Sequence, residues 1–148
     1  MPMRPYRLNE GDFQVPEEWK DTTIHAFVLP GGEGGGAASF VITRDAEAAG
    51  SELQAYADQQ LVKAAQQLPS YNLVARGAST IAEQPAIQSD YTWLTPEGVS
   101  VRQRQACLRH NELILVFTLT ARESVFSTYE PVWSQVVGSL RLRANGVK

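Results

Sequence analysis

Hydrophobic and polar side chains alternate with a period of two in neighbouring segments near the start of the chain. Residues 23–29 and 39–44 alternate in this way and are rich in β-branched and aromatic side chains, which is typical of strands. A shorter segment over residues 13–16 is also predicted to be a strand, and Pro16 ends it. The two longer segments flank residues 31–36, which are five glycines and Glu33. The pattern therefore predicts two strands joined by a glycine-rich connection.

The following segment changes to steps of three and four residues, which predicts an amphipathic helix over residues 51–68. Ser51 is the expected N-cap, and Pro69 ends the helix. The predicted apolar stripe consists of Leu53, Tyr56, Ala57, Leu61, Ala64, Ala65 and Leu68.

Four further strands are predicted over residues 72–81, 86–94, 99–109 and 113–120. Short turn signals at residues 95–98 and 110–112 indicate consecutive antiparallel hairpins. A last helix is predicted over residues 124–140, with Ser127 and Glu130 at capping-box spacing and Pro131 in the first turn. Together these elements predict an α+β fold: a single domain over residues 1–148 with a mainly antiparallel sheet flanked by two helices.

Composition narrows the possible functions. The net charge of −3 and the scattered basic residues argue against nucleic-acid binding. No stretch approaches the roughly 20 apolar residues of a membrane-spanning helix, and the N-terminus does not resemble a signal peptide. The single cysteine, Cys107, excludes an internal disulfide. We therefore expect a cytoplasmic protein.

The sequence contains no strong motif for catalysis or for binding a phosphate, a metal or a cofactor. The glycine cluster leads into a strand and not a helix, and it lacks the Lys-Ser/Thr of a phosphate-binding loop, so a loose hairpin connection is the better interpretation. His25 and His110 have no metal-ligand spacing, and Cys107 falls in a strand, where a small core residue is expected. Nothing marks a nucleophile, a metal site or a cofactor site, so the sequence gives an enzyme no support.

The first two long strands have an unusual second face. Because alternate side chains point to opposite faces, Phe27, Leu29, Phe40 and Ile42 are expected to form core beneath the helices. The other face is small, apolar and dotted with hydroxyls, and it carries no charge before Asp45; its members are Ile24, Ala26, Val28, Ser39, Val41 and Thr43. The strand at 99–109 adds Gln103 and Gln105 to one of its faces. Such a surface is either a binding site or an internal face covered by the second helix or by another copy of the chain.

An ordered set of motifs resembles the Eag chaperones of bacterial type VI secretion, within the DcrB-related family. The motifs are "YRLNEGDFQVPEEWKDTTIHAFVLP", "ASFVITRDA", "YADQQLVKAAQQLPSYNL", "DYTW", "VRQRQACLRHNELILVFTLTA" and "EPVWSQVVGSLR". The resemblance extends over residues 6–143. It implies a PsbP-like α+β fold without catalytic activity or cofactor. It also implies a cytoplasmic adaptor, often a homodimer, that shields the N-terminal transmembrane helices of a secreted effector and aids its loading onto the secretion spike.

The resemblance also implies guest-binding positions, which by motif are Ile24, Ala26, Ser39, Val41, Thr43, Gln60, Leu68 and Gln105. The alternation of faces had already singled out six of them and adds Val28 and Gln103. A different role, that of an envelope-associated structural protein of the wider DcrB-related group, is an alternative that the missing signal segment argues against.

Overall fold

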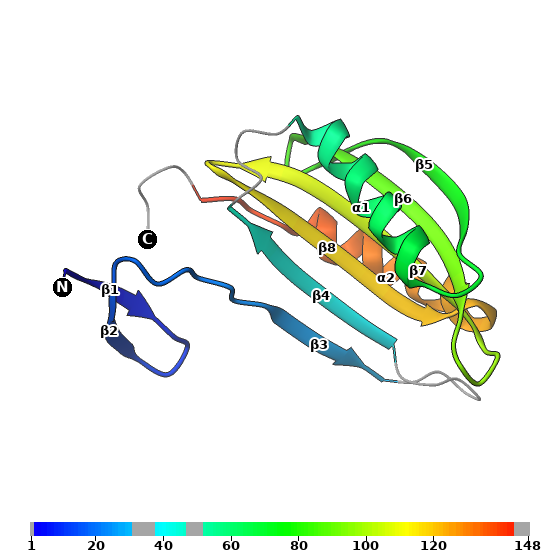
Figure 1. The fold of residues 1–148 in the computed structure, drawn as a ribbon, viewed down its shortest axis with the longest axis horizontal. Coiled ribbons are helices and arrows are strands. Elements are labelled where there is room, and N and C mark those ends of the chain that lie inside the picture. Colours follow the sequence, from blue (N-terminus) through cyan, green and yellow to red (C-terminus); the bar gives the residue numbers. More distant parts are fainter. Residues whose placement is uncertain (1, 31–37, 47–51, 144–148) are drawn as a thin grey trace.

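The computed structural model describes residues 2–30, 38–46 and 52–143. Its helices and strands follow one another in the order drawn in Figure 1. They are β1 (Met3–Arg7), β2 (Asp12–Pro16), β3 (His25–Leu29), β4 (Ala38–Asp45), α1 (Leu53–Gln67), β5 (Asn72–Ile81), β6 (Gln84–Leu94), β7 (Ser100–His110), β8 (Leu113–Arg122) and α2 (Phe126–Gly138), with a 3-10 turn at Glu123–Val125. The predicted glycine connection at residues 31–36 and the N-cap at Ser51 lie outside the described residues.

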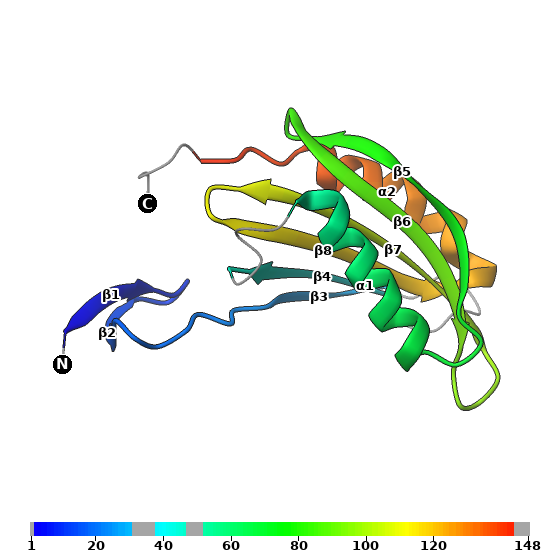
Figure 2. The same cartoon turned by 45° about the horizontal axis from the view of Figure 1, so that its top comes forward.

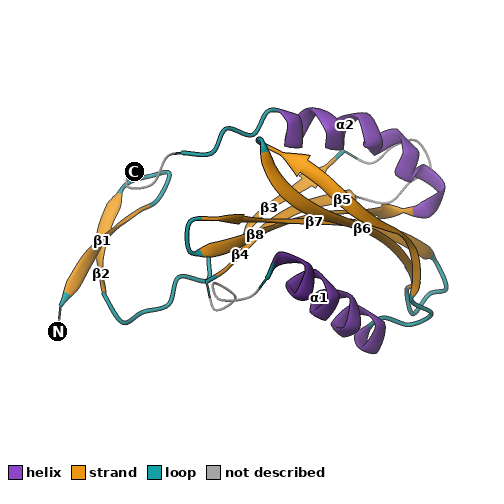
Figure 3. Ribbon diagram, turned by 90° about the horizontal axis from the view of Figure 1, so that it is seen from above, coloured by secondary structure: helices purple, strands orange, loops and turns teal. Residues whose placement is uncertain are grey.

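Six strands form one antiparallel sheet in the order β3-β4-β8-β7-β6-β5. The two helices lie on opposite faces of this sheet, as Figure 3 shows. This arrangement confirms the predicted α+β fold with an antiparallel sheet and two flanking helices. The expected hairpins from β5 to β8 are present. Strand β8 also pairs with β4, so strands from both halves of the chain lie side by side.

The larger core lies between α2 and one face of the sheet. Phe126, Tyr129 and Trp133 of α2 are buried against a cluster that includes Phe40, Phe117 and Leu119. The Phe40 ring packs at a tilt against the rings of Phe117 and Trp133, with centroids 6.3 and 6.0 Å away respectively. Burial of these aromatic side chains between α2 and the sheet contributes most to the stability of such a fold.

Phe27 departs from the prediction that it would be core. Its side chain is 56% exposed, although it lies on the same face as Phe40, with which it pairs across the strands. Since β3 is the edge strand, it lies beyond the centre of the layer that α2 covers. Alternation assigns a residue to a face, but only the position of its strand in the sheet decides whether that face is covered there.

The opposite face is partly covered by α1. Tyr56 and Ala57 are buried against Cys107, Ile114 and Val116. Leu53, Leu61, Ala64 and Leu68 of the predicted stripe are half-buried, whereas Ala65 is exposed, so that member of the stripe was wrongly assigned. An ion pair between Arg76 of β5 and Asp58, 2.6 Å long, ties the helix to the β5 side of the sheet.

The start of α2 also differs from the prediction. A 3-10 turn leads directly into the helix at Phe126, no side chain caps its N-terminus, and Pro131 lies inside it. The predicted capping box at Ser127 and Glu130 is therefore wrong. Pro131 is exposed, and the buried residues on either side of it, Tyr129 and Trp133, hold the helix against the sheet where one backbone hydrogen bond is lost.

Strands β1 and β2 form a separate two-stranded hairpin. The hairpin projects away from the main sheet at the end of the molecule where β3 begins, as Figures 1 and 2 show. The expected strand at residues 13–16 is the second half of this hairpin, and its first half, β1, was not predicted. Tyr6 and Phe13 pack edge to face across the hairpin with ring centroids 5.6 Å apart.

Candidate functional site

The strand register brings the predicted binding residues onto one face. Ala26 pairs with Val41, Val28 with Ser39, and Val41 in turn with Thr118 of β8. Thr118 pairs with Gln105 of β7. Directly paired residues share a face of the sheet. We call this surface the open face and define it as Ala26, Val28, Ser39, Val41, Thr43, Gln103, Gln105, Thr118 and Thr120.

The open face is accessible from solvent. On β3, Val28 is 81% exposed and Ala26 is exposed, while the other members on β4, β7 and β8 are half-buried. Ile24 precedes β3 by one residue and is 60% exposed. The interpretation in which the second helix covers this face is wrong, because α2 lies on the other side of the sheet.

Helix α1 forms a wall along one side of the open face. It packs over β6 and β7, and Figure 1 shows that it leaves β3 and β4 uncovered. The two predicted positions associated with the helix, Gln60 within it and Leu68 just after it, are half-buried and continue the stripe that faces the sheet.

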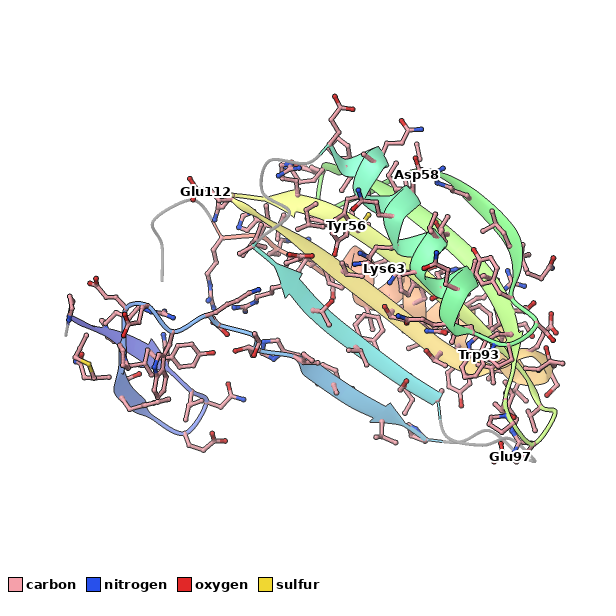
Figure 4. All side chains as sticks on the ribbon, in the orientation of Figure 1. Tyr56, Asp58, Lys63, Trp93, Glu97 and Glu112 are labelled. Atoms are coloured by element: carbon pink, nitrogen blue, oxygen red, sulfur yellow. The ribbon has the colours of Figure 1, made fainter. Side chains whose placement is uncertain are left out.

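Three residues of this region were not predicted from the sequence. Thr118 and Thr120 of β8 lie between the β4 and β7 residues of the open face. Trp93 of β6 lies near the end of α1, as Figure 4 shows, and donates its indole N–H to Oε1 of Gln103 at 2.7 Å. The hydroxyls on alternate residues of β8 were the available signal, but only the pairing of β8 with β4 identifies their face.

The open face carries no charged side chain. Charges appear only at its ends, where Asp45 closes β4, and Arg109 and Arg122 lie near the ends of β7 and β8. Between these ends lie aliphatic groups, four hydroxyls and two amides. An ordinary solvent-facing strand surface carries Lys, Glu or Asp, whereas this one has the composition of surfaces on which membrane helices pack.

The width of the open face fits a helix. Four strands, β3, β4, β8 and β7, at about 4.8 Å spacing give a floor about 14 Å wide. An α-helix with its side chains is about 10–12 Å in diameter. Strands β7 and β8 contain 11 and 10 residues. At roughly 3.3 Å per residue these strands are about 33–36 Å long. Helix α1 covers Cys107, Ile114 and Val116 on this face, so the open part of the face is shorter than the strands.

A second apolar surface lies on the other side of the sheet. It is a groove of about 480 Å³ between β3, β4 and the end of α2, lined among others by Phe27, Ile42, Val132, Val136 and Leu140. This groove is bounded by α2, whereas the open face is bounded by α1. The two surfaces are alternatives for an apolar ligand, and because they are on opposite faces, an experiment can separate them.

Burial raises the pKa values of a thiol and a phenol in the sheet. Burial raises the pKa of the Cys107 thiol to about 11 and, together with the neighbouring Tyr71, raises the pKa of Tyr91 to about 12. Cys107 is 4% exposed, which confirms the predicted core role. Among the described residues, no group of three or more His, Cys, Asp or Glu side chains is arranged to hold a metal ion, and no helix is long and apolar enough to cross a membrane.

Comparison with known proteins gives the family. The DcrB family model matches residues 10–139. EagT6 of Pseudomonas aeruginosa, named as an effector protein, is 35% identical over 138 residues, covering 93% of this chain and 95% of that protein. The chain therefore belongs to the DcrB family, and the predicted resemblance to the Eag proteins is confirmed.

Two solved structures are similar to this chain over most of its length. The crystal structure of PA94, a protein of unknown function from Pseudomonas aeruginosa, has a TM-score of 0.84 at 34% identity, covering 97% of this chain and 99% of that chain. The solution structure of cyanobacterial PsbP from Synechocystis has a TM-score of 0.48 at 12% identity, covering 95% of this chain and 92% of that chain.

Proposed function

We propose that this protein is a cytoplasmic adaptor-chaperone for a type VI secretion effector and that it holds an N-terminal transmembrane helix of that effector on the open face before export. The observation that carries the proposal is the uncharged open face itself, found on a relative of EagT6. By shielding the helix, the protein keeps the effector soluble and helps it load onto the secretion spike. It acts without catalysis or cofactor, and we expect a homodimer.

Burial of apolar surface supplies the affinity. A transmembrane helix in water exposes roughly 20 apolar residues, each worth about 1.5–3 kcal/mol when buried. Small side chains such as Ala26 and Ser39 let the backbone of such a helix approach the sheet closely. The exposed aliphatic groups of Ile24 and Val28 then close over it from the β3 side.

Polar groups on the open face supply selectivity. Hydroxyls on Ser39, Thr43, Thr118 and Thr120 can pair with polar side chains in the guest, as membrane helices pair with one another. Since Gln103 already accepts a hydrogen bond from Trp93, it offers the guest chiefly its amide N–H groups. Gln105 is the next residue of β7 on the same face. Guests with a suitably placed hydroxyl or carbonyl are favoured over purely aliphatic ones.

The proposal is tested by placing charge on the open face. Val41→Glu and Ile24→Glu are each expected to abolish co-purification of the effector's N-terminal region while circular dichroism shows an intact fold, because a buried carboxylate facing an apolar helix is costly. The matched control is Val62→Glu, at a position on α1 that is 56% exposed and outside the open face. Retention of the guest by the folded Val41 variant, or recovery of the wild-type protein in the periplasm, would contradict the proposal.

A further inference from the structure

The open face leads into a pocket beside the turn between β6 and β7. The pocket has a volume of about 360 Å³, and Thr120, a member of the open face, forms part of its wall. The residues that the pocket adds beyond the open face come from this turn and from the adjoining ends of β7 and β8. They include Thr95, Glu97, Val99, Val101 and Arg122.

The strand register places this pocket on the same side of the sheet as the open face. Val101 pairs with Arg122, and two residues further along the strands Gln103 pairs with Thr120. Because alternate residues of a strand share a face, Val101 and Arg122 continue the open face toward the turn. Figure 4 shows Glu97 in this turn at the end of the sheet opposite to Glu112. The pocket therefore lies at one end of the open face.

The pocket has a different composition from the open face. Its apolar part consists of Val101, which is 8% exposed, and the half-buried Val99. Its rim carries the exposed side chains of Glu97 and Arg122, one of each charge, whereas the open face itself is uncharged. Ligand pockets usually measure about 300–1,000 Å³, so this one has room for a single large side chain and not for a helix. Its chemistry suits a group with an apolar body and a polar tip.

We propose that this pocket receives the Trp or Tyr side chain at one end of the guest's transmembrane helix, an inference that rests on the proposed chaperone function. Trp and Tyr are enriched at both ends of membrane helices, where an apolar ring carries a polar N–H or O–H group. In the pocket the ring lies against Val99 and Val101, and the Glu97 carboxylate accepts the N–H or O–H. The Arg122 guanidinium lies over the face of the ring. An aliphatic side chain uses neither charge.

One consequence is that the pocket fixes which part of the guest is held. Burial of aliphatic side chains on the open face depends little on how far the guest helix is shifted along the strands. A large aromatic side chain enters the pocket in one position only, so it sets the end of the helix beside the turn between β6 and β7. This selectivity is separate from that of the hydroxyl and amide groups on the open face.

Titration of the purified full chain with labelled model peptides tests this inference. Each peptide is a helix of about 20 leucine, alanine and serine residues with lysines at both ends for solubility. One peptide carries Trp at its N-terminal end, one carries Trp at its C-terminal end, and one carries Ala at both ends. At least one Trp peptide is expected to bind about tenfold more tightly than the Ala peptide, since burial of a large apolar side chain contributes at least this factor.

Variants of the pocket show whether it causes this preference. Val99→Phe fills the pocket and is expected to abolish the preference for Trp. Glu97→Ala and Arg122→Ala, at exposed positions where the fold is not at risk, are each expected to reduce it roughly threefold. The matched control is Glu112→Ala, an exposed glutamate in the turn at the opposite end of the sheet, which retains the full preference. Circular dichroism checks the fold of each variant.

Two results would overturn the inference and leave the chaperone function standing. The first is equal affinity of the wild type for the Trp and Ala peptides. The second is an undiminished preference for Trp in the folded Glu97 and Arg122 variants, which places the aromatic side chain elsewhere. Failure of all three peptides to bind the wild type would instead contradict the chaperone function, and the inference with it. The two failures are therefore distinguishable.

Discussion

The indole N–H of Trp93 on β6 donates a hydrogen bond to Oε1 of Gln103 on β7 at 2.7 Å, and this bond joins β6 to the open face. It fixes the Gln103 amide with its N–H groups available. Trp93→Phe is expected to leave the fold intact and to weaken binding of the effector segment roughly fivefold, since one hydrogen bond is worth about 1 kcal/mol. A titration with the labelled segment measures the change.

The matched control for this prediction is Trp19→Phe, which makes the same substitution in the β1–β2 hairpin region, away from the open face. Its affinity for the segment should equal that of the wild type. Equal affinities for all three proteins would mean that the orientation of Gln103 does not contribute to binding.

The buried carboxylate of Asp90 holds two arginines of β7. Its Oδ2 lies 2.6 Å from Nη2 of Arg102 and 2.9 Å from Nη2 of Arg104, and both guanidinium groups stand over the Phe126 ring. Burial alone would lower the pKa of Arg104, but Asp90 and Glu130 raise it above its usual value. Asp90→Asn leaves two guanidinium groups without this carboxylate, so we expect about 3 kcal/mol loss of unfolding free energy in urea.

Glu130→Gln is the control for the Asp90 prediction because Glu130 contacts the same Arg104, at 3.2 Å, from an exposed position. An exposed pair contributes less than about 1 kcal/mol. If both substitutions cost the same, the burial of Asp90 is not what makes its ion pairs important.

The thiol of Cys107 should be unreactive in the folded protein. It is buried beneath α1, and burial raises its pKa to about 11, so it is protonated near neutral pH. Modification by a thiol reagent should therefore proceed only as fast as the protein opens, and fully in denaturant. A Val62→Cys variant provides an exposed thiol on the same helix that reacts at once. Equally rapid modification of Cys107 would contradict its burial.

Asp21 links the hairpin to the main sheet and makes this link sensitive to acid. Its carboxylate accepts hydrogen bonds from the Thr23 N–H and hydroxyl and from Tyr6, and Arg44 lies 3.8 Å away. Burial acts to raise the pKa of Asp21, but these partners lower it overall. The folded pKa is below the unfolded value, so the stabilisation is present above the unfolded pKa and is lost as the pH falls through the folded pKa.

We therefore expect Asp21→Asn to lower stability near neutral pH and to have progressively less effect as acid protonates the wild-type carboxylate. Urea unfolding of both proteins at about pH 7 and about pH 3 measures the difference. A difference that is constant across this range would show that the carboxylate charge is not involved.

Much of the fold could be predicted because its signals are local. Alternation along β3 and β4 assigned Ala26, Val28 and Val41 to one face, and the strand register agrees. The apolar stripe of α1 was likewise visible in the spacing from Leu53 to Leu68, with Ala65 as the error. Each of these features depends on side-chain direction within a single element.

The wrong or missing predictions concern residues whose burial or strand pairing depends on distant parts of the chain. Phe27 has the sequence environment of a core residue, but β3 is an edge strand. Thr118 and Thr120 join the open face only through the pairing of β8 with β4, about 75 residues earlier in the chain. Strand β1 was missed because it is short, polar and contains Pro5, so its pairing with β2 is its main support.

Photo-cross-linking from two opposite surfaces tests the central claim most directly. A benzophenone amino acid replaces Thr118 in the middle of the open face or, in a second protein, Val132 in the groove beside α2. Each is co-expressed with the N-terminal region of a type VI effector that begins with an apolar segment and is then irradiated. The account predicts that position 118 cross-links to the effector's apolar segment and position 132 does not. Cross-linking from position 132 alone would contradict it.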